Sequence, residues 1–179
     1  TGTDTTPGFL LDLAIGQFDT YTTMQLAQYI STIANDGYRV EPHIMKEIRE
    51  PTNDQQSLGP ILFEKETNVL NRIGATQAQI EHVQKGFYRV YHYPDGTAYD
   101  QFKDAPYNAA GKSGTAETYV DGELNYNTTL IGYAPFDNPE VAYATMVPAS
   151  HIQASGVADP YVNKYISKRV MDKYFELKK

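Results

Sequence analysis

The sequence predicts an α+β fold in which antiparallel hairpin strands pack against helices. Two segments with helical periodicity, residues 22–34 and 76–91, are each opened by a capping motif. The last third instead contains extended runs joined by turns, followed by a closing helical pattern at residues 161–177. Because the first helices precede the strands instead of alternating with them, an antiparallel sheet is favoured over βαβ units.

The first helix is defined at both of its ends. Residues 1–20, which are rich in Thr, Gly and Asp, are predicted to be loop. Thr22 and Gln25 have the spacing of a capping box and open the helix at residues 22–34. Gly37 is suited to the left-handed C′ position that ends such a helix.

The segment between the two predicted helices is extended and polar. Residues 38–48 are predicted to be a strand, and Pro42 marks it as an edge or irregular one. Residues 50–60 contain Pro and Gly and predict a loop. A short strand is expected at residues 61–64.

The second helix begins with the same signal as the first. Thr76 and Gln79 form a second capping box, and the apolar periodicity continues to about Tyr91. Residues 94–96, Pro-Asp-Gly, predict the turn that follows.

The last third is predicted to form strands and one helix. Residues 108–120 predict a strand of small side chains, and residues 130–134 and 141–147 predict a hairpin. In the closing helix Asp159 is the expected N-cap and Pro160 the expected N1 residue. The expected buried stripe of this helix comprises Val162, Tyr165, Ile166, Val170, Tyr174 and Phe175.

Composition excludes several classes of function. The formal net charge of −7 argues against nucleic-acid or anionic-membrane binding, which require clustered Lys and Arg. The absence of Cys excludes disulfides and thiolate metal sites. The four His lack metal-ligand spacing, and no apolar run reaches the roughly 20 residues of a membrane span. We therefore expect no metal and no cofactor.

The strongest candidate site lies in residues 111–117, Gly-Lys-Ser-Gly-Thr-Ala-Glu. Lys112 provides a positive charge, while Ser113 and Thr115 provide hydroxyls, which together suit an anionic ligand beside an uncovered strand. A hairpin arm with a solvated lysine would explain the same residues. A P-loop is excluded because it needs Gly where the chain has Pro106.

These residues resemble a known family. The Lys-Ser-Gly element at 112–114, followed by the predicted hairpin and terminal helix, resembles the third motif of penicillin-binding transpeptidases. Upstream, the Gly-Gln of residues 16–17, the Gln-Leu-Ala of residues 25–27 and the Ala-Asn-Asp-Gly of residues 34–37 are similar to a segment of the class B, Gram-positive-like members. Thr23 stands where that family commonly has Pro.

The resemblance implies an acyl-transfer enzyme. A serine of such a protein attacks a D-alanyl-D-alanine stem peptide and passes the acyl group to an amine on a neighbouring strand, and β-lactams mimic the donor. The implied location is the extracellular face of the bacterial cytoplasmic membrane. The implied partners are therefore peptidoglycan stem peptides and β-lactams, with no nucleic acid.

The resemblance also assigns roles along the strand. Lys112 is expected to stabilise charge near the substrate carboxylate, and Ser113 and Thr115 to donate hydrogen bonds to it. The Thr115 N–H is an expected oxyanion-hole donor, and Gly114 keeps the approach open. The expected contacts at the rim are Glu117 and Tyr119.

The companion motifs are missing from these 179 residues. No Ser is followed by Lys three positions later, and none by Asn two positions later. We therefore expect residues 1–179 to be the C-terminal portion of one transpeptidase domain that lacks its nucleophile, is inactive alone, and self-associates through an incomplete sheet. A non-catalytic peptide-binding module and a serine β-lactamase or β-lactam-sensor relative remain alternatives.

Overall fold

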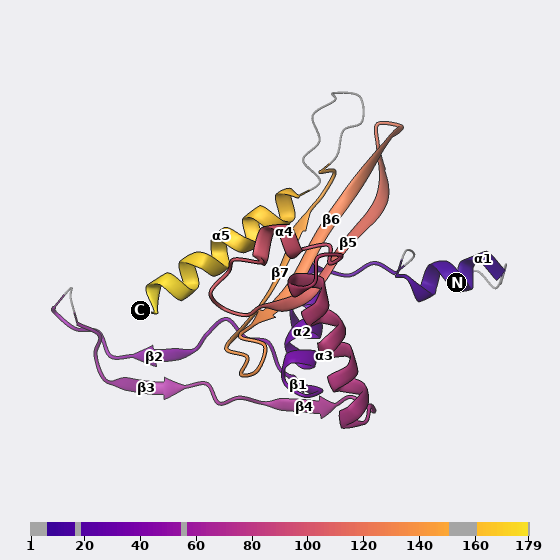
Figure 1. The fold of residues 1–179 in the computed structure, drawn as a ribbon. Helices are drawn as coiled ribbons and strands as arrows, with labels where there is room; N and C mark the ends of the chain where they lie inside the picture. Colours follow the sequence, from indigo (N-terminus) through magenta and orange to yellow (C-terminus); the bar gives the residue numbers. More distant parts are fainter. Residues whose placement is uncertain (1–6, 17–18, 55–56, 151–160, 179) are drawn as a thin grey trace.

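The computed structural model describes residues 7–16, 19–54, 57–150 and 161–178 (Figure 1). The predicted α+β class, with antiparallel sheets and packing helices, is confirmed. The helices and strands follow one another as α1 (Pro7–Ala14), α2 (Thr23–Ala34), β1 (Tyr38–Val40), β2 (Glu47–Arg49), β3 (Ile61–Glu64), β4 (Val69–Arg72), α3 (Gln77–His92), α4 (Tyr99–Phe102), β5 (Ala110–Val120), β6 (Glu123–Ala134), β7 (Val141–Val147) and α5 (Val162–Leu177).

The main sheet has the strand order β5-β6-β7, and both of its pairings are antiparallel. The predicted hairpin that ends in β7 is confirmed, but β6 begins at Glu123, well before the expected residue 130. Asp121 and Gly122 join β5 to β6 with φ values of 53° and 83°. Positive φ at both central residues is typical of the type I′ turn that suits the twist of a hairpin.

Helices cover both faces of this sheet. On one face the α5-side core contains residues from α3, α4 and α5, including Tyr91, Phe102 and Met171, packed on Leu130 of β6. On the other face the α2-side core packs Ile30 of α2 against alternate residues of β6. Side chains of α3 enter both cores, so this helix lies along the β5 edge, where the candidate motif is.

Both capping boxes are confirmed. The Thr22 hydroxyl accepts the Gln25 N–H at 3.2 Å, and the Thr76 hydroxyl accepts the Gln79 N–H at 3.3 Å. At the end of α2, Gly37 has the expected left-handed conformation, with φ of 86°. Asp36 precedes it with φ of 50° and occupies the C′ position itself, since Asn35 is the C-cap.

Residues 38–72 form a long two-stranded arm that projects from the sheet in Figure 1. β1 pairs with β4 near α2, and β2 pairs with β3 further out. The single strand expected at residues 38–48 is thus two short strands, and the segment between them contains Pro42. The expected strand at 61–64 is confirmed, whereas β4 was not predicted.

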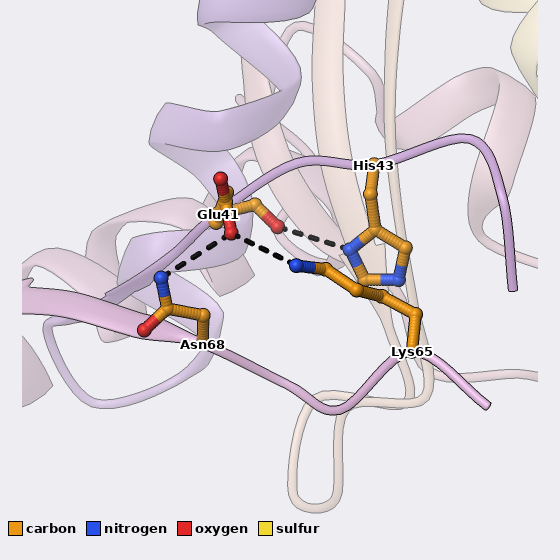
Figure 2. Close-up of polar contacts among 4 residues, drawn as sticks. All are labelled: Glu41, His43, Lys65 and Asn68. Atoms are coloured by element: carbon orange, nitrogen blue, oxygen red, sulfur yellow. Dashed lines mark hydrogen bonds and ion pairs between the residues drawn. The ribbon is translucent and has the colours of Figure 1, made fainter. Parts of the chain in front are cut away.

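A polar cluster ties the two sides of the arm together (Figure 2). The Glu41 carboxylate accepts hydrogen bonds from Asn68 at 3.2 Å and from Lys65 at 3.3 Å. These bonds lower the pKa of Glu41, that of Asn68 contributing most. His43 lies 3.2 Å from the Glu41 carbonyl through its Nδ1. The contacts of this cluster are those of a structural link between the two sides of the arm.

The N-terminal prediction was wrong in one respect. Residues predicted to be loop form α1, a helix of eight residues. Leu10, Leu11 and Ile15 on this helix and just after it are exposed. Together these three side chains form an exposed apolar surface.

The expected buried stripe of α5 was wrong at three of its six positions; Val162, Tyr174 and Phe175 are half-buried, and Phe175 packs against the α5-side core. Tyr165, Ile166 and Val170 are 45%, 44% and 59% exposed. The residues that are buried instead are Asn163, Lys164, Ser167 and Met171. Three of these four are polar, and hydrogen bonds to neighbouring elements satisfy them, which is how polar groups are tolerated in an interior. The expected Asp159 cap and Pro160 lie outside the described residues.

Candidate active site

The candidate motif occupies the best-supported part of β5. Lys112 lies opposite Ile131 of β6, and Thr115 lies opposite Thr128. These two β6 residues are paired in turn with Ala144 and Val147 of β7. Residues 112–115 are therefore backed by two further strands.

Beyond Thr115, β5 is no longer backed by β7. Glu117 and Tyr119 still pair with β6, but β7 ends opposite Thr128. The Ser150 N–H adds a bond to the Tyr126 carbonyl at 2.8 Å. The predicted rim residues thus lie on a two-stranded ribbon that extends past the sheet in Figure 1.

The side chains of the motif leave the strand on two sides. Since successive residues of a strand alternate, Ser113 and Thr115 share one face, and Lys112 and Gly114 share the other. The Lys112 ammonium turns back to the strand and donates to the Ser113 carbonyl at 2.6 Å. The predicted cation therefore lies against the backbone of the residue that carries the first predicted hydroxyl.

The two glycines of the motif differ in what surrounds them. A Cβ on Gly111 would collide with the backbone of Ile131 and Gly132, so close contact between β5 and β6 excludes a larger residue there. A Cβ on Gly114 would meet only the side-chain hydroxyl of Thr129.

A cavity of about 290 Å³ lies between α3 and the motif. It is lined by Gly86, Arg89, Val90, Asp95, Gly96, Thr97 and Lys112. Two cationic side chains and one carboxylate therefore line this concave surface. A surface of this composition can attract a small anionic group.

Two residues that sequence reasoning missed lie behind the motif. The Thr97 and Ser113 hydroxyls are 2.6 Å apart, and the Thr97 carbonyl accepts from the Lys164 ammonium at 2.5 Å. Thr97 directly follows the predicted Pro-Asp-Gly turn. Lys164, Ser167 and Met171 recur at helical spacing, but a search for apolar periodicity passes over such a polar stripe.

Lys164 has an unusual environment for a lysine. It is only 7% exposed, and its ammonium lies 4.4 Å from the centroid of the Tyr161 ring. Burial lowers the pKa of Lys164; Asp100 acts in the opposite direction, and the positive charge of Lys112 lowers the pKa further. Lys112 and Lys164 are therefore near enough to interact electrostatically.

Of the histidines that the structure describes, His43, His82 and His92 take no part in this arrangement. His92 stacks on Tyr88, with ring centroids 4.0 Å apart, and its Nε2 lies 2.8 Å from the Ala109 carbonyl. His151, for which proximity to the motif was weighed, lies outside the described residues. Among the residues that the structure describes, no group of three or more His, Asp and Glu side chains could hold a metal ion. Within the same ranges, no helix combines the length and apolar character that a bilayer span requires.

Comparison with known proteins gives a consistent result over almost the whole chain. Residues 3–172 match the family described as penicillin binding protein transpeptidase domain. Penicillin-binding protein 2A of Bacillus subtilis (strain 168) is 45% identical over 184 residues, covering 99% of this chain and 25% of that protein. The peptidoglycan D,D-transpeptidase MrdA of Haemophilus influenzae is 29% identical over 184 residues, covering 93% of this chain and 26% of that protein.

The fold comparison agrees. Penicillin-binding protein 2B of Streptococcus pneumoniae (strain R6) superposes with a TM-score of 0.80 at 32% identity, covering 99% of this chain and 28% of that one. The chain thus spans about a quarter of the length of the relatives it matches. With its residues matched from 3 to 172, the chain belongs to the penicillin-binding protein transpeptidase domain family, and its relatives are class B members.

Proposed function

We propose that this chain forms the Lys-Ser-Gly wall of the acyl-transfer site of a peptidoglycan D,D-transpeptidase. The observation that carries the proposal is the position of residues 112–115 on β5, backed by β6 and β7 and bordered by a cavity with two cations. The whole protein would act on D-alanyl-D-alanine stem peptides and be acylated by β-lactams.

The proposed roles follow the chemistry of the strand. Lys112 provides positive charge beside the substrate carboxylate, and the Ser113 and Thr115 hydroxyls donate to that carboxylate. The Thr115 N–H faces the developing oxyanion, and the donor peptide pairs with the strand edge by main-chain hydrogen bonds. Glu117 and Tyr119 contact the substrate further along the ribbon.

The reaction also needs groups that these 179 residues do not contain. We propose that the nucleophilic serine, its lysine base and the second motif belong to another part of the same domain, of which residues 1–179 are the C-terminal portion. The whole protein would act at the outer face of the cytoplasmic membrane. The 179-residue chain would then bind no β-lactam covalently.

Labelling with a fluorescent penicillin tests these roles. In the full-length protein, Lys112→Ala should lower the rate of labelling by about 100-fold or more, the effect of losing a preorganised charge at an acyl-transfer site. Lys85→Ala removes an exposed lysine of α3 and serves as the matched control that should label normally. Normal labelling of the Lys112→Ala protein would contradict the proposal.

The 179-residue chain provides the complementary measurement. Incubated with the same penicillin, it should show no covalent adduct by intact-mass spectrometry, because it has no Ser-x-x-Lys motif. An adduct on any of its serines would contradict the proposed division of the active site.

A further inference from the structure

Three segments distant in sequence meet at Thr97: the turn before α4, which contains it, strand β5 through Ser113, and helix α5 through Lys164. We propose that Thr97 and Lys164 are positioning residues that orient the Ser113 hydroxyl toward the substrate carboxylate. This inference rests on the proposed function, because it takes Ser113 to be a carboxylate-binding residue.

The hydroxyl pair has only one arrangement that suits this role. Thr97 Oγ1 and Ser113 Oγ are 2.6 Å apart, a short hydrogen bond in which either group can be the donor. A serine has a single hydroxyl proton, so Ser113 can donate to a carboxylate only if it accepts from Thr97. The Thr97 hydroxyl therefore fixes the direction of the Ser113 O–H, and the two bonds strengthen each other.

Thr97 is itself held by its neighbours in the chain. The Gly96 N–H donates to the Tyr93 carbonyl at 2.8 Å, and the Ala98 N–H donates to the Val90 carbonyl at 3.1 Å. Ala98 is fully buried in the α5-side core. A Cβ on Gly96 would collide with the Val90 carbonyl, so the turn fits closely against α3. The Thr97 backbone is thus confined on both sides.

Lys164 provides the third point of attachment. Lys164 lies in the first turn of α5, and its ammonium donates to the Thr97 carbonyl at 2.5 Å. The same ammonium lies over the aromatic ring of Tyr161. A buried ammonium is unfavourable unless it is paired, so this contact strongly constrains the Thr97 peptide. Lys164 therefore connects the last helix to a hydroxyl of the motif through one intervening residue.

The test is a double-mutant cycle in the full-length protein, with the second-order rate constant for acylation by a fluorescent penicillin as the measurement. Thr97→Val removes the hydroxyl at nearly constant volume and should lower the rate constant about three- to tenfold. Ser113→Ala should lower it about tenfold or more, since a hydrogen bond to a charged group is lost. Thr97→Val added to Ser113→Ala should have no further effect, and Thr97→Ser should restore the wild-type rate constant.

Controls separate positioning from general destabilisation. Thr52→Val removes a bonded hydroxyl in the arm, outside the main sheet, and should leave the rate constant unchanged. Lys164→Met should slow acylation in the wild-type background but not in the Thr97→Val, Ser113→Ala background, measured below the melting temperature of each variant. The cycle distinguishes a positioning effect from a stability effect, because lost stability would lower the rate constant in both backgrounds.

The outcomes that overturn the inference are distinct. Independent, multiplicative effects of Thr97→Val and Ser113→Ala would show that Thr97 does not act through Ser113. A Thr97→Val protein that acylates at the wild-type rate would do the same. If Ser113→Ala itself acylates normally, the proposed carboxylate-binding role of Ser113 fails, and the inference fails with it.

Discussion

Tyr91 of α3 and Tyr143 of β7 hold their hydroxyl oxygens 2.7 Å apart inside the protein. Burial raises the pKa of Tyr91 well above its usual range, with the neighbouring Tyr143 adding to the effect. Burial also raises the pKa of Tyr143, although its hydrogen bond to Tyr91 opposes part of the rise. At the scale of single residues, the core therefore keeps two phenols protonated.

These shifts predict a loss of stability in alkaline solution. The unfolded chain ionises its tyrosines near pH 10, whereas the folded chain keeps Tyr91 and Tyr143 protonated to higher pH. The unfolded state therefore binds fewer protons above about pH 10, and the free energy of unfolding falls as the pH rises from there. Urea unfolding at about pH 8 and about pH 11 should show this decrease.

Replacing one phenol should weaken that dependence. Tyr143→Phe removes one of the two groups and should reduce the loss of stability above about pH 10, at a cost of about 1–3 kcal/mol at neutral pH because the buried Tyr91 hydroxyl loses its partner. Tyr119→Phe is the control, since Tyr119 is 70% exposed. An unchanged pH dependence in Tyr143→Phe would rule out this pair as its origin.

Candidate site residues could be proposed from the sequence where the chemistry is local. Lys112, Ser113 and Thr115 are neighbours, so their types and order alone indicate an anion-binding strand. The contacts of Thr97 and Lys164 with the motif could not be found in this way, because they join segments that only the fold brings together. No spacing along the chain encodes the direction of a hydroxyl.

At the scale of elements, the capping box of α3 is a direct test of a sequence prediction. Thr76→Ala removes the hydroxyl that accepts the Gln79 N–H and should lower the free energy of unfolding by about 1 kcal/mol. Thr76→Ser keeps the acceptor and should lie close to the wild type. Chemical denaturation of the 179-residue chain measures both, and equal losses in the two variants would argue against the cap.

The elements that were predicted had strong local signals, whereas β4 had none. The helices α2 and α3 begin at the predicted caps, and β7 occupies the predicted range. All four residues of β4 are exposed, so no alternation of apolar and polar residues marked it as a strand. The first half of β6 could have been found, because Asp121-Gly122 is a typical hairpin turn.

At the scale of the whole molecule, α5 presents an apolar surface on its outer side. Tyr165, Ile166, Val170 and Leu177 are all exposed there, and the outer edge of β7 has no partner strand within the described residues. Exposed apolar surface and an unpaired strand edge both favour association.

We therefore expect the 179-residue chain to self-associate. Sedimentation velocity should show a larger species as the concentration rises, and Ile166→Lys with Val170→Lys should shift the population toward monomer, since both positions are exposed and tolerate charge. Arg169→Lys, at an exposed position of the same helix, should have no such effect. A single monomeric species at high concentration would contradict the expectation.

The fold class and the family could be predicted from the sequence, because capping boxes and motif order can be recognised within the 179 residues themselves. The side of α5 that faces the sheet could not be predicted from the sequence. That choice depends on what packs on both sides of the helix, and the polar residues Asn163 and Ser167 occupy the inner side through specific hydrogen bonds.

The unequal support of β5 has a mechanical consequence. From Lys112 to Thr115, β5 is supported by β6 and, behind it, by β7. Toward Tyr119 it is paired with β6 alone. Thermal bending concentrates in this second part, where fewer hydrogen bonds resist it. In the proposed site, the supported part would keep the spacing of its cation and hydroxyls constant, while the part that carries Glu117 and Tyr119 would adapt to ligands of different shape. One strand would then combine a stiff region for an unvarying chemical group with a compliant region for a variable one.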